Sequence, residues 1–407
     1  MSRIDKLIAE YCPEGVEFKA IGEIAELVRG NGMPKSDFSE SGVGCIHYGQ
    51  IYTYYGIWTT DTISFVPPEK AEKLAKVEPG DLVITNTSEN LEDVCKSVAW
   101  LGGSQIVTGG HATVIKTEQD PKYLSYYFRT PEFFAQKKKQ ATGAKVIDVS
   151  AKNLAKIRIP IPPIEVQREI VKVLDNFTQL EAELEAELEA RRLQYQHYRD
   201  ALLAFGDQDV RWTTMAEVGE FFRGRRFTKN DLNADGLACI HYGDIYTQYG
   251  TATTATVSHV RSDMASTLRF AKHGDLVIAG VGETVEDVGK AVAWLGDGEV
   301  AIHDDCFAFR HSLNPKFVSY YFQTAAFHAE KNKYVARAKV KRLSAENLGK
   351  LAIPVPPPDE QERIVAILDK FDALVNDLSS GLPAEIAARR KQYEHYRDRL
   401  LTFREAA

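Results

Sequence analysis

The fold is predicted most directly from residues 159–205, which read IPIPPIEVQREIVKVLDNFTQLEAELEAELEARRLQYQHYRDALLAF. After the proline-rich opening of this stretch, apolar residues recur at steps of three, four and seven, which is the spacing of a coiled-coil seam. The seam positions are Ile170, Leu174, Phe177, Leu184, Leu188, Tyr195, Tyr198, Leu202 and Phe205. Two copies of the word Glu-Ala-Glu-Leu fill 181–188. The pattern predicts one long helix.

A second seam of the same kind runs from Ile364 to Phe403. It is interrupted at 380–383, Ser-Gly-Leu-Pro, where proline removes a backbone donor, so we expect a kink or a restart at Pro383. Two apolar stripes in one chain favour an antiparallel pair that buries both seams. The alternatives are that each helix packs on its own domain, or that the helices pair between chains.

The chain contains an internal repeat, with two copies of one sequence unit. CIHYG at 45–49 recurs 194 residues later, at 239–243. The same offset relates GDLVI at 80–84 to 274–278, VAWLG at 98–102 to 292–296, and SYYF at 125–128 to 319–322. In the helical regions YRD at 198–200 meets YRD at 396–398, an offset of 198. The second copy therefore carries four extra residues, about one helical turn.

The globular part of each copy mixes strand and turn signals. Apolar runs at 82–84 and 113–115 lie between Gly-rich turns, and helix signals follow over 122–129 and from Thr130, the expected N-cap, with Pro131 at the first helical position. A chain of 407 residues needs more than one core. The predicted fold class is α+β: two similar mixed α/β domains, a pseudo-twofold internal repeat, separated by two long helices that form an antiparallel coiled coil. We place the domains at 1–160 and 206–355, and the helical regions at 161–205 and 356–407.

Composition indicates a soluble globular protein, with 44% apolar and 26% charged residues. No apolar run approaches the roughly 18 residues of a membrane span, and the start lacks a signal peptide's apolar stretch, so we expect no membrane contact and a cytoplasmic location. The five cysteines show no Cys-x-x-Cys spacing, which argues against disulfides and zinc. Cys45 and Cys239 hold matched places and are predicted to be buried apolar groups.

Catalytic motifs are missing from the sequence. It contains no Gly-x-Gly-x-x-Gly loop and no phosphate loop, and Gly280-Val281-Gly282 lacks the third glycine. No proline pair follows Asn or Asp as in an amino-methyltransferase motif. No metal spacing of histidines repeats in both halves, so we predict no catalytic site, no cofactor and no metal. The duplicated His47 and His241 are interpreted as structural groups or DNA-facing donors.

Basic segments recur at one repeat position, although the formal net charge of −7 argues mildly against nucleic acid. We expect these side chains to contact phosphate; a merely solvated helix face is the alternative. The segments after the short helices comprise Lys137, Lys138, Lys139 and Lys145, and Lys331, Lys333, Arg337, Lys339, Lys341 and Arg342. A second set near each start comprises Arg29 and Lys35, and Arg223, Arg225, Arg226 and Lys229.

An aromatic stretch follows this second set in both copies, with its tyrosines within 48–55 and 242–249. Half of its tyrosines are expected in the core of a strand. The rest, led by Tyr48 and Tyr242, join the two histidines as candidates to reach base edges. Differences in base preference are expected where the copies disagree inside matched surroundings, namely Gln50 against Asp244, Tyr54 against Gln248, and Asn31 against Arg225.

The layout resembles the specificity subunits of type I restriction-modification systems. The resemblance is carried by LIAEYCPEGVE at 7–17, IVKVLDNF at 170–177, QYQHYRD at 194–200 and the Gly-Leu-Pro break at 381–383, and it covers essentially the whole chain. The Glu-Ala-Glu-Leu words are similar to the class in which such repeats lie in the central helix.

The resemblance implies a DNA-recognition subunit that reads a bipartite target in double-stranded DNA, one half-site in the major groove per domain. It implies that the helical regions act as spacer and as docking surface for two methyltransferase subunits, with restriction and translocase subunits joining that core. S-adenosylmethionine, ATP and Mg²⁺ would then belong to those partners, which carry out adenine methylation and DNA cleavage. Two rival classes are a non-catalytic tandem-repeat scaffold that binds proteins only, and a standalone methyltransferase or nuclease. The paired basic segments count against the first, and the missing motifs against the second.

Overall fold

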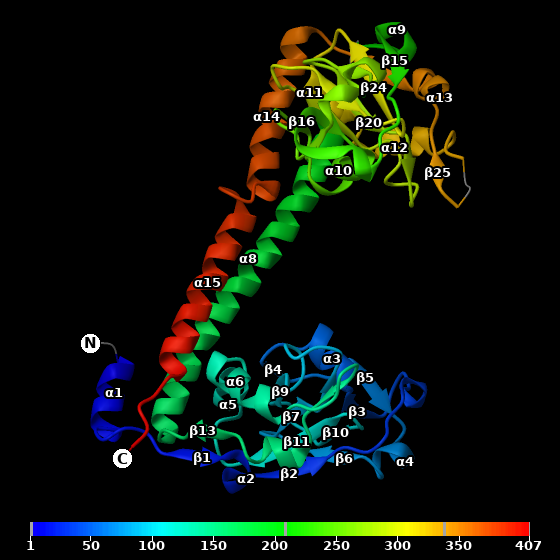
Figure 1. The fold of residues 1–407 in the computed structure, drawn as a ribbon. Helices are drawn as coiled ribbons and strands as arrows, with labels where there is room; N and C mark the ends of the chain where they lie inside the picture. The colour runs from blue at the N-terminus through cyan, green and yellow to red at the C-terminus, as the bar shows by residue number, and fades with distance from the viewer. Residues whose placement is uncertain (1–2, 207–209, 337–338, 407) are drawn as a thin grey trace. The chain divides into compact units, whose positions relative to one another are not determined.

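The computed structural model describes residues 3–206, 210–336 and 339–406. The chain divides into two compact units, Met1–Glu183 with Ile386–Ala407, and Leu184–Glu385. Each unit combines one α/β domain with a pair of helical segments (Figure 1). Helix α8, Ile164–Ala204, is continuous and contributes one half to each unit. The two-domain α+β fold predicted from the sequence is confirmed.

The first domain is built on two mixed sheets. The five-stranded sheet has the order β2 (Ala25–Arg29), β11 (Ala112–Thr117), β7 (Leu82–Thr85), β9 (Ser97–Trp100) and β4 (Trp58–Thr59). The four-stranded sheet has the order β5 (Ser64–Val66), β3 (Val43–Ile46), β10 (Ile106–Thr108) and β6 (Ala75–Val77). Two ribbons pair β1 (Phe18–Ala20) with β13 (Arg158–Pro160), and β8 (Thr87–Ser88) with β12 (Ile147–Asp148).

The second domain repeats this topology strand for strand. Its five-stranded sheet has the order β15 (Gly219–Arg223), β24 (Cys306–His311), β20 (Leu276–Ala279), β22 (Ala291–Trp294) and β17 (Ala252–Thr253). Its four-stranded sheet has the order β18 (Ser258–Val260), β16 (Leu232–Ile240), β23 (Val300–Ile302) and β19 (Phe270–Ala271). Its ribbons pair β14 (Arg211–Thr214) with β26 (Ala352–Val355), and β21 (Val281–Gly282) with β25 (Lys341–Arg342). The repeat in sequence is thus a repeat in fold.

The central strand β7 explains why its sequence is apolar at successive positions. Leu82 and Ile84 face the core shared with the helices, whereas Val83 faces the core between the two sheets. Side chains alternate along a strand, so a strand covered on both faces reads as a continuous apolar run. Cys45 and Cys239, on β3 and β16, are fully buried, which confirms their predicted role as small apolar groups.

Short helices pack on the sheets and close the turns. Thr130 caps α6 (Pro131–Gln140) by accepting the Phe133 N–H, with Pro131 at the first position as predicted. The other short helices of the first domain are α1 (Arg3–Tyr11), α2 (Ile21–Ile24), α3 (Tyr48–Thr53), α4 (Pro68–Ala71), α5 (Pro121–Tyr127) and α7 (Ala151–Leu154). Those of the second are α9 (Met215–Val218), α10 (Tyr242–Thr247), α11 (Pro315–Tyr321), α12 (Ala325–Lys331) and α13 (Ala345–Lys350).

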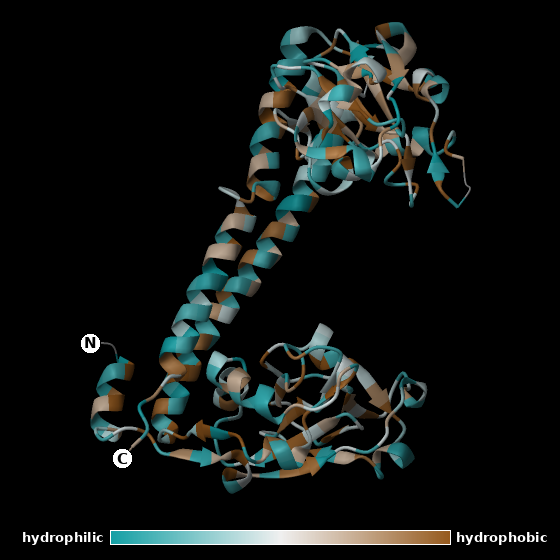
Figure 2. Cartoon of the chain, viewed as in Figure 1, coloured by the Kyte–Doolittle hydropathy of each residue, from teal (hydrophilic) through white to brown (hydrophobic). Residues whose placement is uncertain are grey.

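The long helices pair in an antiparallel manner within each unit. In the first unit α8 lies beside α15 (Leu382–Leu401), with Phe177 stacked on Tyr396 at 5.4 Å between ring centroids. In the second unit α8 lies beside α14 (Pro358–Asn376), where the ring of Tyr198 stacks on Phe371, also at 5.4 Å. Figure 2 shows hydrophobic residues alternating with hydrophilic ones along these helices. The predicted pairing of the seams within one chain is confirmed.

The predicted break in the second seam falls at 377–381, between α14 and α15. Gly381 leaves no room for a side chain, because an added Cβ would lie 2.5 Å from the Ala373 carbonyl oxygen. The helix restarts at Leu382, one residue before the proline, which suits the first turn of a helix. The four extra residues of the second copy fall between Asp369 and Ala388, the stretch that contains this break, and α8 has no such interruption.

Each domain is fastened to its helix by a matched set of contacts. Asp175 of α8 accepts from Tyr126 Oη and Lys122 Nζ, both at 2.8 Å. In the second domain Asp369 of α14 accepts from the matched tyrosine and lysine, both at 2.7 Å. No helix in the described parts of the chain is long and apolar enough to cross a membrane.

Candidate nucleic-acid interface

His47 and His241 are the N-cap residues immediately before the matched helices α3 and α10. The Nδ1 atom of each imidazole accepts a backbone N–H at 3.1 Å, from Gly49 and Gly243 respectively. Burial lowers the pKa of both histidines, which favours the neutral ring that has an acceptor nitrogen. These side chains therefore have a structural role as caps of helices.

Gln50 and Asp244 complete the same caps from the other side. Gln50 Oε1 accepts the His47 N–H at 2.9 Å while its Nε2 donates to Ser64 Oγ at 2.6 Å. Asp244 accepts the His241 N–H at 3.2 Å. Both polar ends of Gln50 and one carboxylate oxygen of Asp244 are thus committed to their own domain. The structure gives no support to the expectation that this pair reads bases.

The aromatic stretch is split between core and surface. Tyr55 is buried, whereas the Tyr54 side chain is 63% exposed. Tyr48 and Tyr242 are half-buried, each against the ring of the preceding histidine, with centroids 4.3 and 4.2 Å apart. Both tyrosine side chains are thus partly accessible at the surface.

Lys137 and Lys331 are corrections to the predicted phosphate contacts. Both side chains are buried, with 3% and 0% exposure. Their Nζ atoms donate to backbone carbonyl oxygens, 2.6 Å from Val94 in the first domain and 2.6 Å from Val288 in the second. Burial lowers the pKa of both lysines. An ammonium group held in this way supports a loop and does not reach a phosphate.

The remaining basic and polar candidates lie mainly on the surface. Exposed side chains are those of Arg29, Asn31, Lys35, Lys138, Lys139, Lys145, Arg223, Arg225, Arg226, Lys229, Lys333, Lys339 and Arg342. Lys341 is half-buried, and Arg337 lies outside the described residues. The two basic segments of each copy are about a hundred residues apart in sequence, so their relation depends on the fold.

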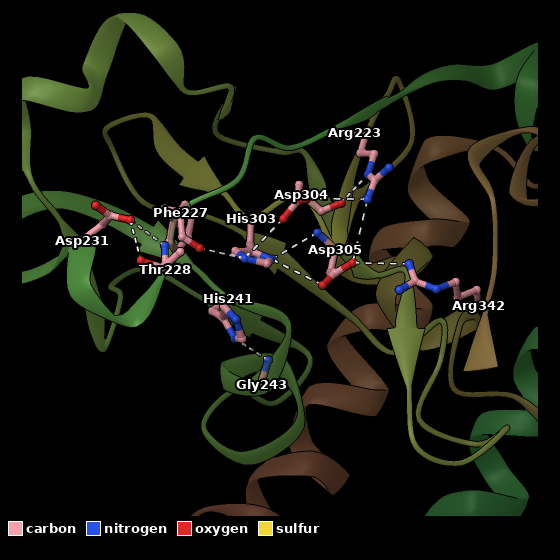
Figure 3. A network of polar contacts seen from close by, with 10 residues as sticks. All are labelled: Arg223, Phe227, Thr228, Asp231, His241, Gly243, His303, Asp304, Asp305 and Arg342. Atoms are coloured by element: carbon pink, nitrogen blue, oxygen red, sulfur yellow. Dashed lines mark hydrogen bonds and ion pairs between the residues drawn. The ribbon is translucent and has the colours of Figure 1, made fainter. Parts of the chain in front are cut away.

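In the second domain the two basic segments meet at the turn between β23 and β24. Figure 3 shows Asp305 between Arg223 and Arg342. The Arg223 guanidinium lies 3.8 Å from both Asp304 and Asp305, and the Arg342 guanidinium lies 3.6 Å from Asp305. These residues line one cleft together with Phe307, among others. The fold thus brings predicted residues of both segments to one place.

His303 belongs to the same turn and, with the two aspartates, forms a group whose ligand atoms lie within 4.8 Å of one another. Its hydrogen bonds argue against a metal ligand. Nε2 lies 3.0 Å from the Phe227 carbonyl oxygen and so acts as donor, while Nδ1 accepts the Asp305 N–H at 3.1 Å. Both ring nitrogens are committed, and the carboxylates face arginines, so the group is better described as an ion-pair network.

In the first domain a hollow at the corresponding turn, 109–111, gathers a different set of predicted residues. It is lined by Gly32, Met33, Pro34, Lys35, His47, Tyr48, Gly110 and His111. Asn31 is held beside it, because its Nδ2 donates to the Lys73 carbonyl oxygen at 3.1 Å. The predicted Lys35, His47 and Tyr48 therefore do come together.

His111, Asp304 and Asp305 line these candidate sites, and the sequence reasoning missed them. A usable signal was present, because Gly109-Gly110-His111 in the first copy stands against His303-Asp304-Asp305 in the second, between well-matched strands. Because the flanking strands match and the turn residues differ, this turn is a place where the two domains differ in chemistry.

Comparison with known proteins identifies the family. A family model described as the type I restriction modification DNA specificity domain matches twice, at 13–190 and 209–388. The chain is 31% identical over 291 residues to the specificity subunit of the Escherichia coli type I restriction enzymes EcoR124I and EcoR124II, covering 69% of this chain and 70% of that relative. It is 29% identical to a specificity subunit of Haemophilus influenzae named as putative, over 95% of this chain and 96% of that relative. The chain therefore belongs to the family of type I restriction-modification DNA specificity subunits.

Solved structures share the fold. A chain from work on complex assembly and conformational transition of the type I R-M system matches with a TM-score of 0.66 and 18% identity, covering 96% of this chain and 98% of the other. The HsdS subunit from Thermoanaerobacter tengcongensis matches with a TM-score of 0.51 and 18% identity, over 96% of this chain and 97% of the other. The repeated α/β domains and long helices are thus a known architecture.

Proposed function

We propose that this chain recognises a bipartite sequence in double-stranded DNA, with one half-site per α/β domain. The observation that carries the proposal is that the fold gathers predicted DNA contacts at the same turn of each repeat: Lys35, His47 and Tyr48 in the first hollow, and Arg223 and Arg342 in the second cleft. Exposed lysines and arginines supply the attraction to phosphate, and polar groups in each hollow read base edges.

The helices serve as a spacer and as the docking surface for two methyltransferase subunits, and restriction and translocase subunits join that complex. This chain contributes recognition and no catalysis, because its sequence carries no catalytic motif. S-adenosylmethionine, ATP and Mg²⁺ are held by the partners. A protein-only scaffold is less well supported, since it leaves the clustered arginines and lysines without a role.

The test is methylation by the chain with and without its methyltransferase partner. The purified chain alone should transfer no methyl group, and the assembled complex should methylate one adenine in each half-site. Robust methylation by the isolated chain contradicts this division of labour. A gel shift of the complex on random-sequence DNA at two salt concentrations separates DNA binding from a scaffold role.

A further inference from the structure

The two domains reverse their charge at one matched position next to the turn that joins the two sheets. In the first domain β8 pairs with β12 so that Thr87 lies opposite Asp148. In the second, β21 pairs with β25 so that Val281 lies opposite Arg342, 194 residues further on at both positions. The equivalence rests on the register of the strands as well as on sequence. An acid in one domain thus occupies the backbone position of a guanidinium in the other.

The neighbouring turn changes its chemistry in step. In the first domain the turn places His111, whose Nδ1 lies 2.9 Å from the hydroxyl of Thr87, the residue opposite Asp148. In the second domain the same turn position holds Asp305, which pairs with Arg342. In the first domain a strand acid lies opposite the threonine that contacts the turn histidine, whereas in the second a strand arginine pairs directly with the turn acid. The substitution is therefore a coordinated change between two elements.

The second-domain arginines form ion pairs with the turn acid and remain accessible. Asp305 lies between Arg223 and Arg342, which limits the freedom of two long side chains, as Figure 3 shows. Both guanidinium side chains nevertheless stay 53% and 59% exposed at the cleft. A pre-oriented guanidinium loses less conformational freedom when it forms a bidentate contact.

We propose that Asp148 and Arg342 contact the equivalent base pair of the two half-sites with opposite hydrogen-bonding polarity, and that Asp305 positions Arg342. The proposal rests on the proposed function. A guanidinium donates only and matches the O6 and N7 acceptors of guanine, whereas a carboxylate accepts only and matches the amino group of cytosine or adenine. The half-site read by the second domain should therefore have guanine where the other has cytosine or adenine.

The experiment selects bound sequences from DNA duplexes with both half-sites randomised, using the full chain assembled with its methyltransferase partners. In the variant Arg342→Asp with Asp305→His, the second domain carries the residues of the first. Guanine preference at one position of the second half-site should fall by about 5- to 150-fold, the range of one bidentate contact. The other half-site serves as internal control and should not change. If base preference is unaltered while the slope of log affinity against log salt falls by about 0.9, Arg342 is a phosphate contact and the proposal is overturned.

Two further variants keep the result independent of folding. Arg342→Gln alters one exposed side chain and should lower the guanine preference even if the double variant melts early. Asp305→Asn should relax the same preference while Asp305→Glu retains it, a difference that a merely structural role does not produce. Equal selection by Asp305→Asn and the parent refutes the positioning role. If the parent complex selects no bipartite sequence at all, the proposed function fails, and that outcome is distinct from a failure of this inference.

Discussion

At the scale of single residues, the buried lysines show that a basic segment can include a side chain that faces the core. Lys137 lies four residues after Phe133, and Lys331 lies four after Phe327, so each lysine shares a helix face with a buried aromatic ring. The lysine run is conspicuous in the sequence. Which of its lysines points into the core becomes clear only once the buried phenylalanine four residues earlier is recognised. Lys138 and Lys139, on the other faces of α6, remain the exposed candidates.

The first prediction separates these two kinds of lysine. Changing Lys138 and Lys139 to Gln should weaken binding of all DNA sequences alike and lower the slope of log affinity against log salt by about 0.9 for each phosphate that is no longer neutralised. Lys137→Met, the matched control, should lower the thermal stability and leave that slope unchanged, because its Nζ is bonded inside the domain. Titrations at several salt concentrations and a thermal melt measure the two effects. A reduced slope in Lys137→Met would show that its ammonium group reaches DNA after all.

The second prediction concerns pH. Burial lowers the pKa of Lys331 to about 8, whereas an unfolded lysine titrates near 10.4. Between about pH 8 and 10 the unfolded state thus binds more protons than the folded state, so the Lys331 contribution makes the free energy of unfolding rise with pH. Denaturant unfolding across this range should show the rise in the parent and in the exposed control Lys333→Met, and should show it diminished in Lys331→Met. Identical pH dependence in all three proteins refutes the assignment.

At the scale of elements, the sequence was informative wherever a local pattern determines structure. The seams, the Thr130 cap and the break before Pro383 follow from spacing and from the chemistry of one or two residues, and all three are present in the structure. The turn at 303–305 was not predictable in this way, because Arg223 lies 81 residues from Asp304 in sequence and Arg342 lies 37 residues from Asp305. Ion pairs of this kind depend on tertiary structure.

The third prediction concerns the length of α8. One extra Glu-Ala-Glu-Leu word inserted after Leu188 lengthens a straight helix by about 6 Å, against about 3.4 Å per base pair of DNA. We expect the spacer between the half-sites to grow by one base pair, below the rigid limit of nearly two, because the paired helices α14 and α15 keep their length. The added rotation of about 40° is close to the roughly 34–36° of one base pair. Mapping methylated adenines measures the spacer. An unchanged spacer with full activity would show that these words are only an acidic face.

At the scale of the whole molecule, the shared topology of the domains bears on the symmetry of the target. Matched strand orders and matched caps, His47 in one domain and His241 in the other, favour similar half-sites on opposite strands. The fourth prediction is therefore a nearly palindromic target, with a difference where Asp148 and Arg342 stand. Exchanging Asp148 and Arg342 between the two copies should move that difference from one half-site to the other. Wholly unrelated half-sites contradict it.

We infer that this chain alone selects the bipartite sequence that its partners modify. The most direct measurement is methylome sequencing of one host that expresses the methyltransferase partner with and without this chain. We predict new methylated adenines only when the chain is present, one in each of two similar half-sites on opposite strands separated by a fixed spacer. Identical methylomes with and without the chain would contradict this inference. So would a single contiguous target in place of two separated half-sites.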